Sequence, residues 1–163
     1  MGITLGGGIS RGQHAALPHT PAMVAGFLQI VRKTIDETVN NSAVLQNDNE
    51  LLFNMGANET WFILTNLRCS TKAASGFKLA FTVPAGAAFR GTWTNQAFLG
   101  DEYDLTASLN TGAGLALPVF KHFAAYIGGA AAGVLRLQWA QSVAVAEDTT
   151  VLANSSMIAI RVS

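Results

Sequence analysis

Residues 59–86 constrain the fold most, because they hold two alternating apolar runs around a polar spacer. The first run places Trp61, Ile63, Leu67 and Cys69 on one face, and the second places Phe77, Leu79, Phe81 and Val83 on one face. A period of two is that of a β-strand with one buried face. Residues 71–76 are rich in turn-forming types, and Pro84 cannot donate to a β-ladder. The stretch predicts two antiparallel strands of one sheet.

Short runs with strand character recur along the rest of the chain. They cover residues 35–39, 51–55, 88–94, 119–127, 134–141 and 156–162. The run at 119–127 is apolar on both faces, which is typical of a central strand. Residues 46–49, 95–116 and 149–152 are predicted as a loop, a long irregular segment and a short connection.

This pattern predicts an all-β fold, an antiparallel jelly-roll β-sandwich of about eight strands with an extended N-terminal arm. An immunoglobulin-like sandwich is the alternative, although its Cys and Trp spacing is missing. The alternation of apolar residues along each strand shows which face is buried. It predicts a core between the two sheets that includes Trp61, Phe81, Leu137 and Trp139.

The first 31 residues differ from the rest and are predicted as an arm, with the sandwich domain at 32–163. Glycines and prolines in this segment oppose regular structure, although residues 22–31 are a candidate short helix. A disordered tail would be more polar than this segment. We expect its apolar side chains to order against a neighbouring subunit or a capsid, as assembly contacts: Ile3, Leu5, Ile9, Met23, Phe27 and Leu28.

Composition suggests a subunit whose surface is covered by copies of itself or by partners. The 163 residues suit one domain, and only 12% are charged, about half the usual fraction. Ten basic residues balance ten acidic ones, and this neutrality argues against a nucleic-acid partner. No apolar run reaches the length of a membrane span, and no signal peptide is apparent. Cys69 lies on an apolar face, so a buried, inert thiol is expected.

Few residues suggest chemistry, and we assign no catalytic, cofactor-binding or metal-binding residue and no cofactor. His14 and His19 lack neighbouring carboxylates, and His122 falls within a predicted strand. The acidic cluster of Asp101, Glu102 and Asp104 lacks the ligand pattern of a calcium loop and is expected in a solvated loop. The three tryptophans, Trp61, Trp93 and Trp139, could stack on sugars, but all lie on apolar faces, which favours core packing.

Four segments together resemble small β-sandwich virion proteins of tailed bacteriophages. They are residues 51–62 (LLFNMGANETWF), 77–86 (FKLAFTVPAG), 135–142 (LRLQWAQS) and 154–162 (NSSMIAIRV). The resemblance covers roughly residues 45–163 and rests on strand and turn signatures. It implies a jelly roll, commonly trimeric, used as a head-decoration (cement) protein or in a tail appendage, and it carries over no catalytic residue.

Composition, arm and resemblance together predict a virion structural protein rather than an enzyme. The leading hypothesis is a homotrimeric capsid decoration protein, made in the host cytoplasm, that binds the major capsid protein or another virion protein through multivalent apolar contacts. A tail or fibre module that binds host-surface glycans is the alternative. A hydrolase using Asp101, Glu102 and Asp104 is a third hypothesis.

Overall fold

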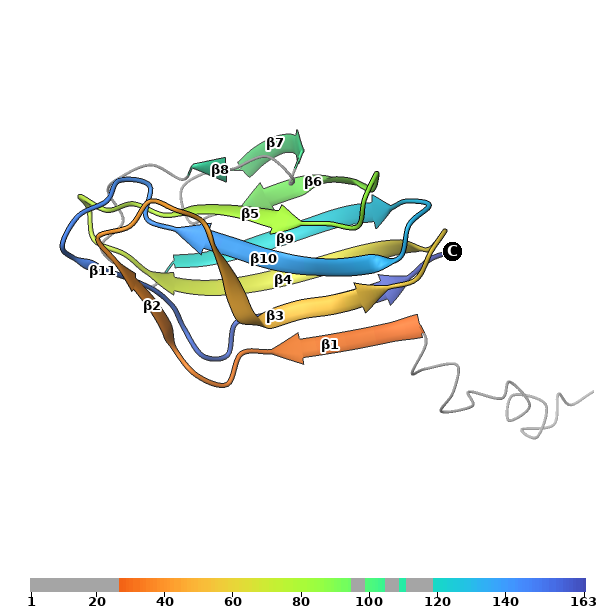
Figure 1. Cartoon of the computed structure of the whole chain (residues 1–163), viewed down its shortest axis with the longest axis horizontal. Coiled ribbons are helices and arrows are strands. Elements are labelled where there is room, and N and C mark those ends of the chain that lie inside the picture. Colours follow the sequence, from red (N-terminus) through yellow and green to blue (C-terminus); the bar gives the residue numbers. More distant parts are fainter. Residues whose placement is uncertain (1–26, 95–98, 105–108, 111–118) are drawn as a thin grey trace, which may run out of the picture.

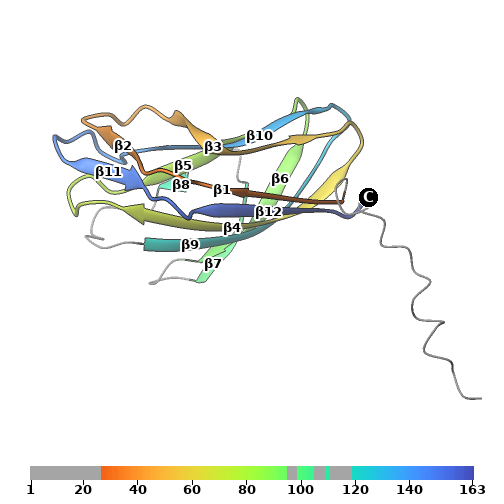
Figure 2. The ribbon, with the colours of Figure 1, turned by 90° about the horizontal axis from the view of Figure 1, so that it is seen from below.

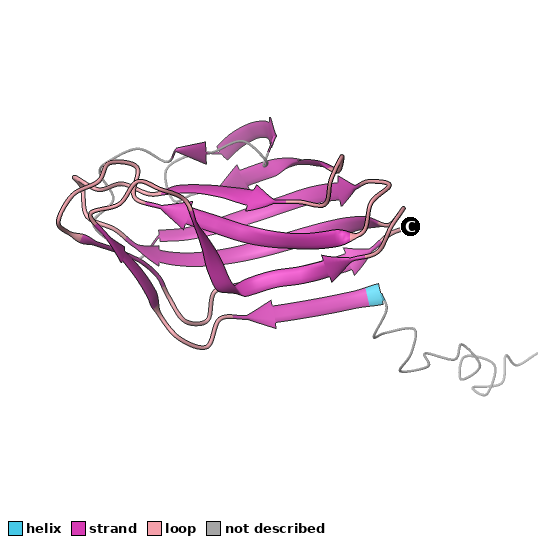
Figure 3. Ribbon diagram, in the orientation of Figure 1, coloured by secondary structure: helices cyan, strands magenta, loops and turns pink. Residues whose placement is uncertain are grey.

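The computed structural model describes residues 27–94, 99–104, 109–110 and 119–163, with side chains described for 27–92 and 127–163. This part of the chain forms twelve β-strands, and every pairing between them is antiparallel (Figures 1 and 3). The strands are β1 (Leu28–Arg32), β2 (Glu37–Asn40), β3 (Gln46–Met55), β4 (Thr60–Ser70), β5 (Lys78–Thr82), β6 (Ala88–Thr94), β7 (Leu99–Asp104), β8 (Leu109–Asn110), β9 (Val119–Gly128), β10 (Gly133–Ala140), β11 (Asp148–Val151) and β12 (Ser156–Arg161).

The strands form two sheets that face each other across one core (Figure 2). The larger sheet has the order β1-β12-β4-β9-β6-β7, and β11 joins it beside β4 and carries β2 on its other edge. The smaller sheet has the order β3-β10-β5-β8. The all-β antiparallel fold is confirmed, and the two facing sheets are compatible with a jelly roll.

Aromatic side chains connect the two sheets through the core. Phe81 on β5 meets Phe89 on β6 edge to face, with ring centroids 5.1 Å apart. Phe53 on β3 contacts Trp61 on β4 at 6.0 Å. Burial of Trp61, Phe81, Leu137 and Trp139 is confirmed, since none is more than 3% exposed. The alternation of apolar residues therefore predicted the buried faces of these strands correctly.

The pairing of the two strands at residues 59–86 was predicted wrongly. β4 lies in the larger sheet and β5 in the smaller one, so residues 71–76 cross between layers. The crossing is held by buried hydroxyls, because the Thr71 hydroxyl donates to the Gly76 carbonyl at 2.8 Å and contacts the Ser75 hydroxyl at 2.8 Å. Gly76 has φ 58°, a conformation that favours glycine. Alternation fixes the buried face of a strand, but it does not choose the neighbouring strand.

Three segments predicted as connections contain strand residues, and they add β7, β8 and β11 to the eight predicted strands; β1, inside the predicted arm, is the twelfth. Residues 46–49 begin β3, residues 149–151 belong to β11, and β7 and β8 lie within 95–116. The polar run in β3 coincides with a β-bulge, where four residues from 48 to 51 oppose the single residue Leu137 of β10. Bulges accept the residue types that usually signal a loop, which explains this error.

The first strand begins inside the predicted arm. β1 pairs with β12 from Leu28↔Ile160 to Arg32↔Ser156, so residues 28–31 are strand and not part of a helix. Val31 packs against the core, and the Gln29 side chain donates to the Asn54 carbonyl at 3.0 Å. These inward contacts add β1 to the edge of the sheet. Residues 1–26 lie outside the described part of the chain, and the division at residue 31 stays a prediction.

Candidate assembly surface

The outward face of the larger sheet is apolar over three neighbouring strands. On β12, Met157 and Ala159 are buried, so the alternating Ile158 and Ile160 face away from the core. On β4 the inward residues include Trp61 and Ile63, which turns Phe62 and Leu64 outward. On β1 the inward contacts of Gln29 and Val31 leave Leu28 and Ile30 on the same outward face.

Strand register gathers these six side chains into two rows. One row joins Ile30, Ile158 and Leu64, and the next joins Leu28, Ile160 and Phe62. Directly opposed residues of an antiparallel pair have Cβ atoms about 4.5–5.5 Å apart, so the rows form one continuous patch. Ile30 is 64% exposed and Leu64 is 39% exposed, while the other four are half-buried. We call these six residues the apolar patch.

A polar row bounds the apolar patch at one end. This row consists of Arg32, Ser156 and Asn66. At the opposite end, the exposed apolar Val162 follows β12, with 51% of its surface exposed, and its amide donates to the Thr60 carbonyl. A patch of aliphatic and aromatic groups that meets polar residues at its edge resembles the core and rim of a protein–protein interface.

An outward sheet face of this kind needs an explanation. An antiparallel sheet that packs on one core usually alternates apolar inward with polar outward residues. Here residues 61–64 are apolar at every position, and Ile158 and Ile160 flank the buried Ala159. Contiguous exposed apolar groups mark surfaces that another molecule covers. The apolar patch is therefore the candidate functional site.

Two of the six predicted assembly contacts lie in the described part of the chain. Phe27 directly precedes β1 and is 51% exposed, and Leu28 belongs to the apolar patch. Ile3, Leu5, Ile9 and Met23 lie outside the described residues. The assembly role of all six stays a prediction.

Sequence reasoning missed five of the six residues of the patch. Ile30, Phe62, Leu64, Ile158 and Ile160 were not predicted as contact residues, although a signal was present. An unbroken apolar run such as residues 61–64 has no polar face, and such a run indicates burial on both sides of a sheet. The position of β12 beside β4 then brings a second set of outward residues next to the first.

A group of hydrogen bonds to Glu59 holds together the end of the sandwich where β4 begins and β12 ends. The Glu59 carboxylate accepts hydrogen bonds from Arg161 Nη1 at 2.8 Å, the Gly56 amide at 2.6 Å and Trp61 Nε1 at 3.0 Å. The Arg161 guanidinium, followed by the Gly56 amide, lowers the pKa of Glu59 below its usual value. Glu59 thus joins the C-terminal strand to the turn before β4.

We expect Glu59→Gln to lose less stability than the wild-type protein as the pH falls. A carboxyl group whose folded pKa is depressed stabilises the fold above its unfolded pKa, and this contribution disappears as the pH falls through the folded pKa. The wild-type protein should therefore lose more melting temperature than Glu59→Gln between pH 7 and about pH 3. Thermal unfolding followed by circular dichroism over this range provides the measurement. Equal slopes for the two proteins would show that Glu59 does not contribute.

The side chains of the residues considered for chemistry lie largely outside the described part of the chain, and only the strands that carry some of them are placed. Asp101, Glu102 and Asp104 belong to β7 rather than to a solvated loop, and Asp104 pairs in register with Arg90 of β6. Within the described residues, no group of three or more His, Cys, Asp or Glu side chains is arranged to hold a metal ion. His122 lies in β9, and the buried thiol of Cys69 agrees with prediction.

Core packing is confirmed for Trp61 and Trp139, which are at most 2% exposed and offer no platform for a sugar. The side chain of Trp93, together with His14 and His19, lies outside the described part. Among the described residues, no helix is long and apolar enough to cross a membrane.

Comparisons with known proteins give no family. No protein-family model matches the sequence, and no curated protein matches it. Among solved structures, the chain is similar to the tripod (BppUct-A-L) from the baseplate of bacteriophage Tuc2009, with 8% identity and a TM-score of 0.37 over 99% of this chain and 73% of that chain. It is also similar to a structure of infectious bursal disease virus Gx strain, with 11% identity and a TM-score of 0.25 over 82% of this chain and 41% of that one. Likenesses at these TM-scores carry no argument about the role of this chain.

Proposed function

We propose that this chain is a structural subunit of a tailed-phage virion, which forms a homotrimer and decorates the head lattice. The observation that carries the proposal is the apolar patch on the larger sheet. Complete burial of an exposed aliphatic or aromatic side chain contributes about 1.5–3 kcal/mol, and half-buried residues contribute part of this value, so the six residues together supply the central contact of a stable interface. The role is structural and requires no catalytic residue.

The patch is proposed to contact the N-terminal segment of the next copy. A ring of three subunits uses heterologous contacts, in which a surface on one copy meets a different surface on its neighbour. Residues 1–26 contain Ile3, Leu5, Ile9 and Met23, and they precede the exposed Phe27 at the start of β1. An extended segment spans about 3.3 Å per residue, so 26 residues are long enough to reach a neighbouring sheet.

Two sequence features support an assembled rather than a solitary subunit. Only 12% of residues are charged and the net charge is zero, a composition that promotes association. The strand and turn signatures between residues 51 and 162 resemble those of small phage virion proteins. Repetition of one contact over a lattice multiplies weak individual affinities.

Replacing Leu64 by Glu is expected to dissociate the oligomer. A charge forced into an apolar contact costs about 2 kcal/mol or more, which raises the dissociation constant at least about 30-fold. The matched control is Val134→Glu, because Val134 is 38% exposed on β10 of the other sheet and Leu64 is 39% exposed. Size-exclusion chromatography with light scattering at several concentrations measures the effect. A wild-type monomer at micromolar concentration, or equal behaviour of the two variants, contradicts the proposal.

Deleting residues 2–26 should reproduce the effect of Leu64→Glu, and the combined variant should be no weaker than either alone. Independent, additive losses would show that the segment and the patch have different partners. Binding of each variant to phage heads that lack this protein then tests the decoration role. Labelling of tails instead of heads, or binding of the isolated protein to a glycan array, would favour the tail or fibre alternative.

A further inference from the structure

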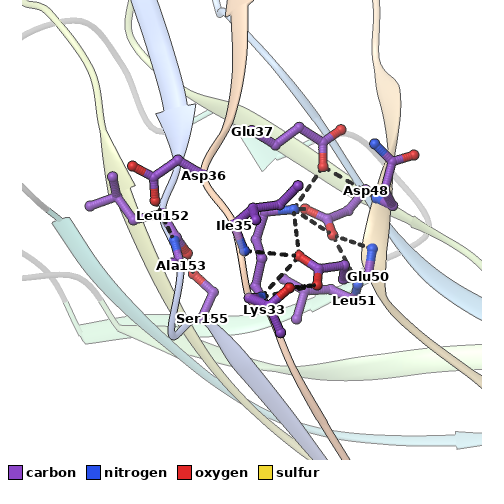
Figure 4. A network of polar contacts seen from close by, with 12 residues as sticks. Lys33, Ile35, Asp36, Glu37, Asp48, Glu50, Leu51, Leu152, Ala153 and Ser155 are labelled. Carbon is purple, nitrogen blue, oxygen red and sulfur yellow. Dashed lines mark hydrogen bonds and ion pairs between the residues drawn. The ribbon is translucent and has the colours of Figure 1, made fainter.

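A lysine with no solvent exposure lies among carboxylates at the corner between β1 and β2 (Figure 4). Lys33 Nζ is 2.7 Å from Glu37 Oε2, and it is 3.1 and 3.0 Å from Asp48 Oδ1 and Oδ2. Glu50 Oε2 lies further away, at 3.8 Å. The side chain of Asp48 is also fully buried, whereas Glu37 is 16% exposed. Sequence reasoning had not singled out any of these residues.

The backbone holds both ends of this contact in place. The Lys33 amide donates to the Ser155 carbonyl at 2.8 Å, and the Lys33 carbonyl accepts from the Asn154 amide at 2.9 Å. Asp48 lies in the bulge of β3, and its Oδ1 accepts hydrogen bonds from the amides of Glu50 at 3.0 Å and Leu51 at 2.8 Å. The amine and the carboxyl group are therefore fixed against each other by two separate parts of the fold.

We propose that Lys33 and Asp48 join covalently, through an amide bond between Lys33 Nζ and Asp48 Cγ. The carboxyl carbon lies between two oxygens at 3.0 and 3.1 Å, so it is within about 3.5 Å of the nitrogen. This is the separation at which bound reactants are placed for attack. The inference does not depend on the proposed function.

The surroundings of Asp48 supply what the addition step requires. As the nitrogen attacks the carbon, negative charge develops on Oδ1, which already receives the Glu50 and Leu51 amides. Their distances of 3.0 and 2.8 Å fall within the range of about 2.7–3.1 Å expected of donors that stabilise an oxyanion. In the product, the same two amides hydrogen-bond the new amide carbonyl.

Glu37 is placed to move the protons. The reaction joins an ammonium and a carboxylate to give a neutral amide and one water molecule. Glu37 takes a proton from Nζ and frees the lone pair that forms the N–C bond. The tetrahedral intermediate loses Oδ2 when the C–Oδ2 bond breaks, and this oxygen leaves as water with the two protons given up by Nζ. No oxidant, metal or nucleotide is required.

The charges around Lys33 define the starting state of the reaction. Burial lowers the pKa of Lys33, but hydrogen bonds and attraction from Glu37 and Asp48 outweigh burial, so the pKa is raised overall. The group therefore starts as an ammonium, and reaction requires proton transfer to Glu37 within the site. One cation faces three carboxylates, Glu37, Asp48 and Glu50, which leaves a carboxylate free to accept that proton.

The bond would cross-link the two sheets near the N-terminus. Lys33 follows β1 of the larger sheet, and Asp48 belongs to β3 of the smaller sheet. A pull on the N-terminal side of β1 would separate this edge strand from β12, but it would be stopped at Lys33 by a covalent link. Such a link suits a subunit that is held through residues preceding β1.

Intact-mass spectrometry of the full-length chain, unfolded in acid, tests the proposal directly. We expect a mass lower than that of the sequence by one water molecule. Trypsin cleaves after an unmodified Lys33 and yields peptide 34–68, whereas an acylated Lys33 resists cleavage and yields peptide 33–68, lighter by one water. A wild-type chain with the full mass and a normal 34–68 peptide overturns the proposal.

Two variants separate the amide from other losses of water. Lys33→Arg keeps the positive charge but lacks a primary amine, so it should have the full mass. Persistent water loss in Lys33→Arg would assign the deficit to a succinimide at Asp48-Asn49 and overturn the proposal. Glu37→Gln keeps an acceptor oxygen but cannot take the proton, so most of the freshly purified chain should be unlinked. Complete linkage in Glu37→Gln would overturn the proton-transfer role of Glu37.

Discussion

Replacing Phe81 by Ala lowers the free energy of unfolding by about 3–5 kcal/mol, as removal of a buried aromatic ring does. Phe81 is 3% exposed, and its ring meets Phe89 edge to face at 5.1 Å. This pair joins β5 of the smaller sheet to β6 of the larger sheet. The variant loses both the transfer energy of the ring and a contact between layers. Equilibrium unfolding in urea or guanidinium chloride gives the difference.

Thr82→Ala is the matched control, because Thr82 is the next residue of β5 and its side chain is exposed. It should change the free energy of unfolding by no more than about 0.5 kcal/mol. If Phe81→Ala costs less than about 1 kcal/mol, the ring does not contribute to the core and the inward phase of β5 is wrong. Similar losses in both variants would also contradict the assignment.

Periodicity carried most of the correct predictions of the fold. Alternation depends only on the side chains of one strand, so it predicted the buried residues of β5 and β10 without knowledge of their neighbours. The prediction for residues 88–94 coincides with β6, and the apolar run at 119–127 is a central strand between β4 and β6. Local pattern was sufficient for these strands but not for β12, where Met157 and Ala159 face the core and the more apolar Ile158 and Ile160 face outward.

Strand pairing was beyond reach because it depends on contacts distant in sequence. β4 pairs with β9 and β12, whose residues lie fifty or more positions from their partners in β4, and not with β5, which follows β4 directly. A spacer of six residues allows both a return within one sheet and a crossing to the other. Only the buried hydroxyls of Thr71 and Ser75 reveal that the segment turns through the interior.

Polar strands were missed for a related reason. β3 begins with a run of Asn, Asp and Glu, residue types that are rare in strands. Asp48 is nevertheless fully buried, because the bulge directs it to Lys33 and to two backbone amides. The compensating lysine lies fifteen residues earlier, before strand β2. The composition of a short stretch therefore does not reveal that Asp48 has an ion-pair partner fifteen residues away.

The apolar patch was only partly predictable. Low charge and an apolar N-terminal segment led to the hypothesis of contacts outside the core, which stays a prediction. The positions of the patch required the order β1-β12-β4, since each strand contributes only two of its residues. Ile30 is an example. Its segment was predicted as an arm, but the structure places it in β1, at the edge of the larger sheet.

Replacing Lys33 by Met is expected to cost about 3–5 kcal/mol of unfolding free energy, which is typical of removing one partner of a buried ion pair. Met fills a similar volume, so the loss comes from charge rather than from a cavity. The variant leaves Asp48 fully buried without its cation, and Glu37 loses its contact at 2.7 Å.

Replacing both partners tests that reasoning. In Lys33→Met/Asp48→Leu no buried carboxylate remains at position 48, so the double variant should recover a large part of the stability lost in Lys33→Met. Chemical unfolding of the wild type and the two variants at pH 7 measures the effect. A double variant that is less stable than Lys33→Met would mean that Asp48 stabilises the bulge through the Glu50 and Leu51 amides rather than through its charge pairing with Lys33.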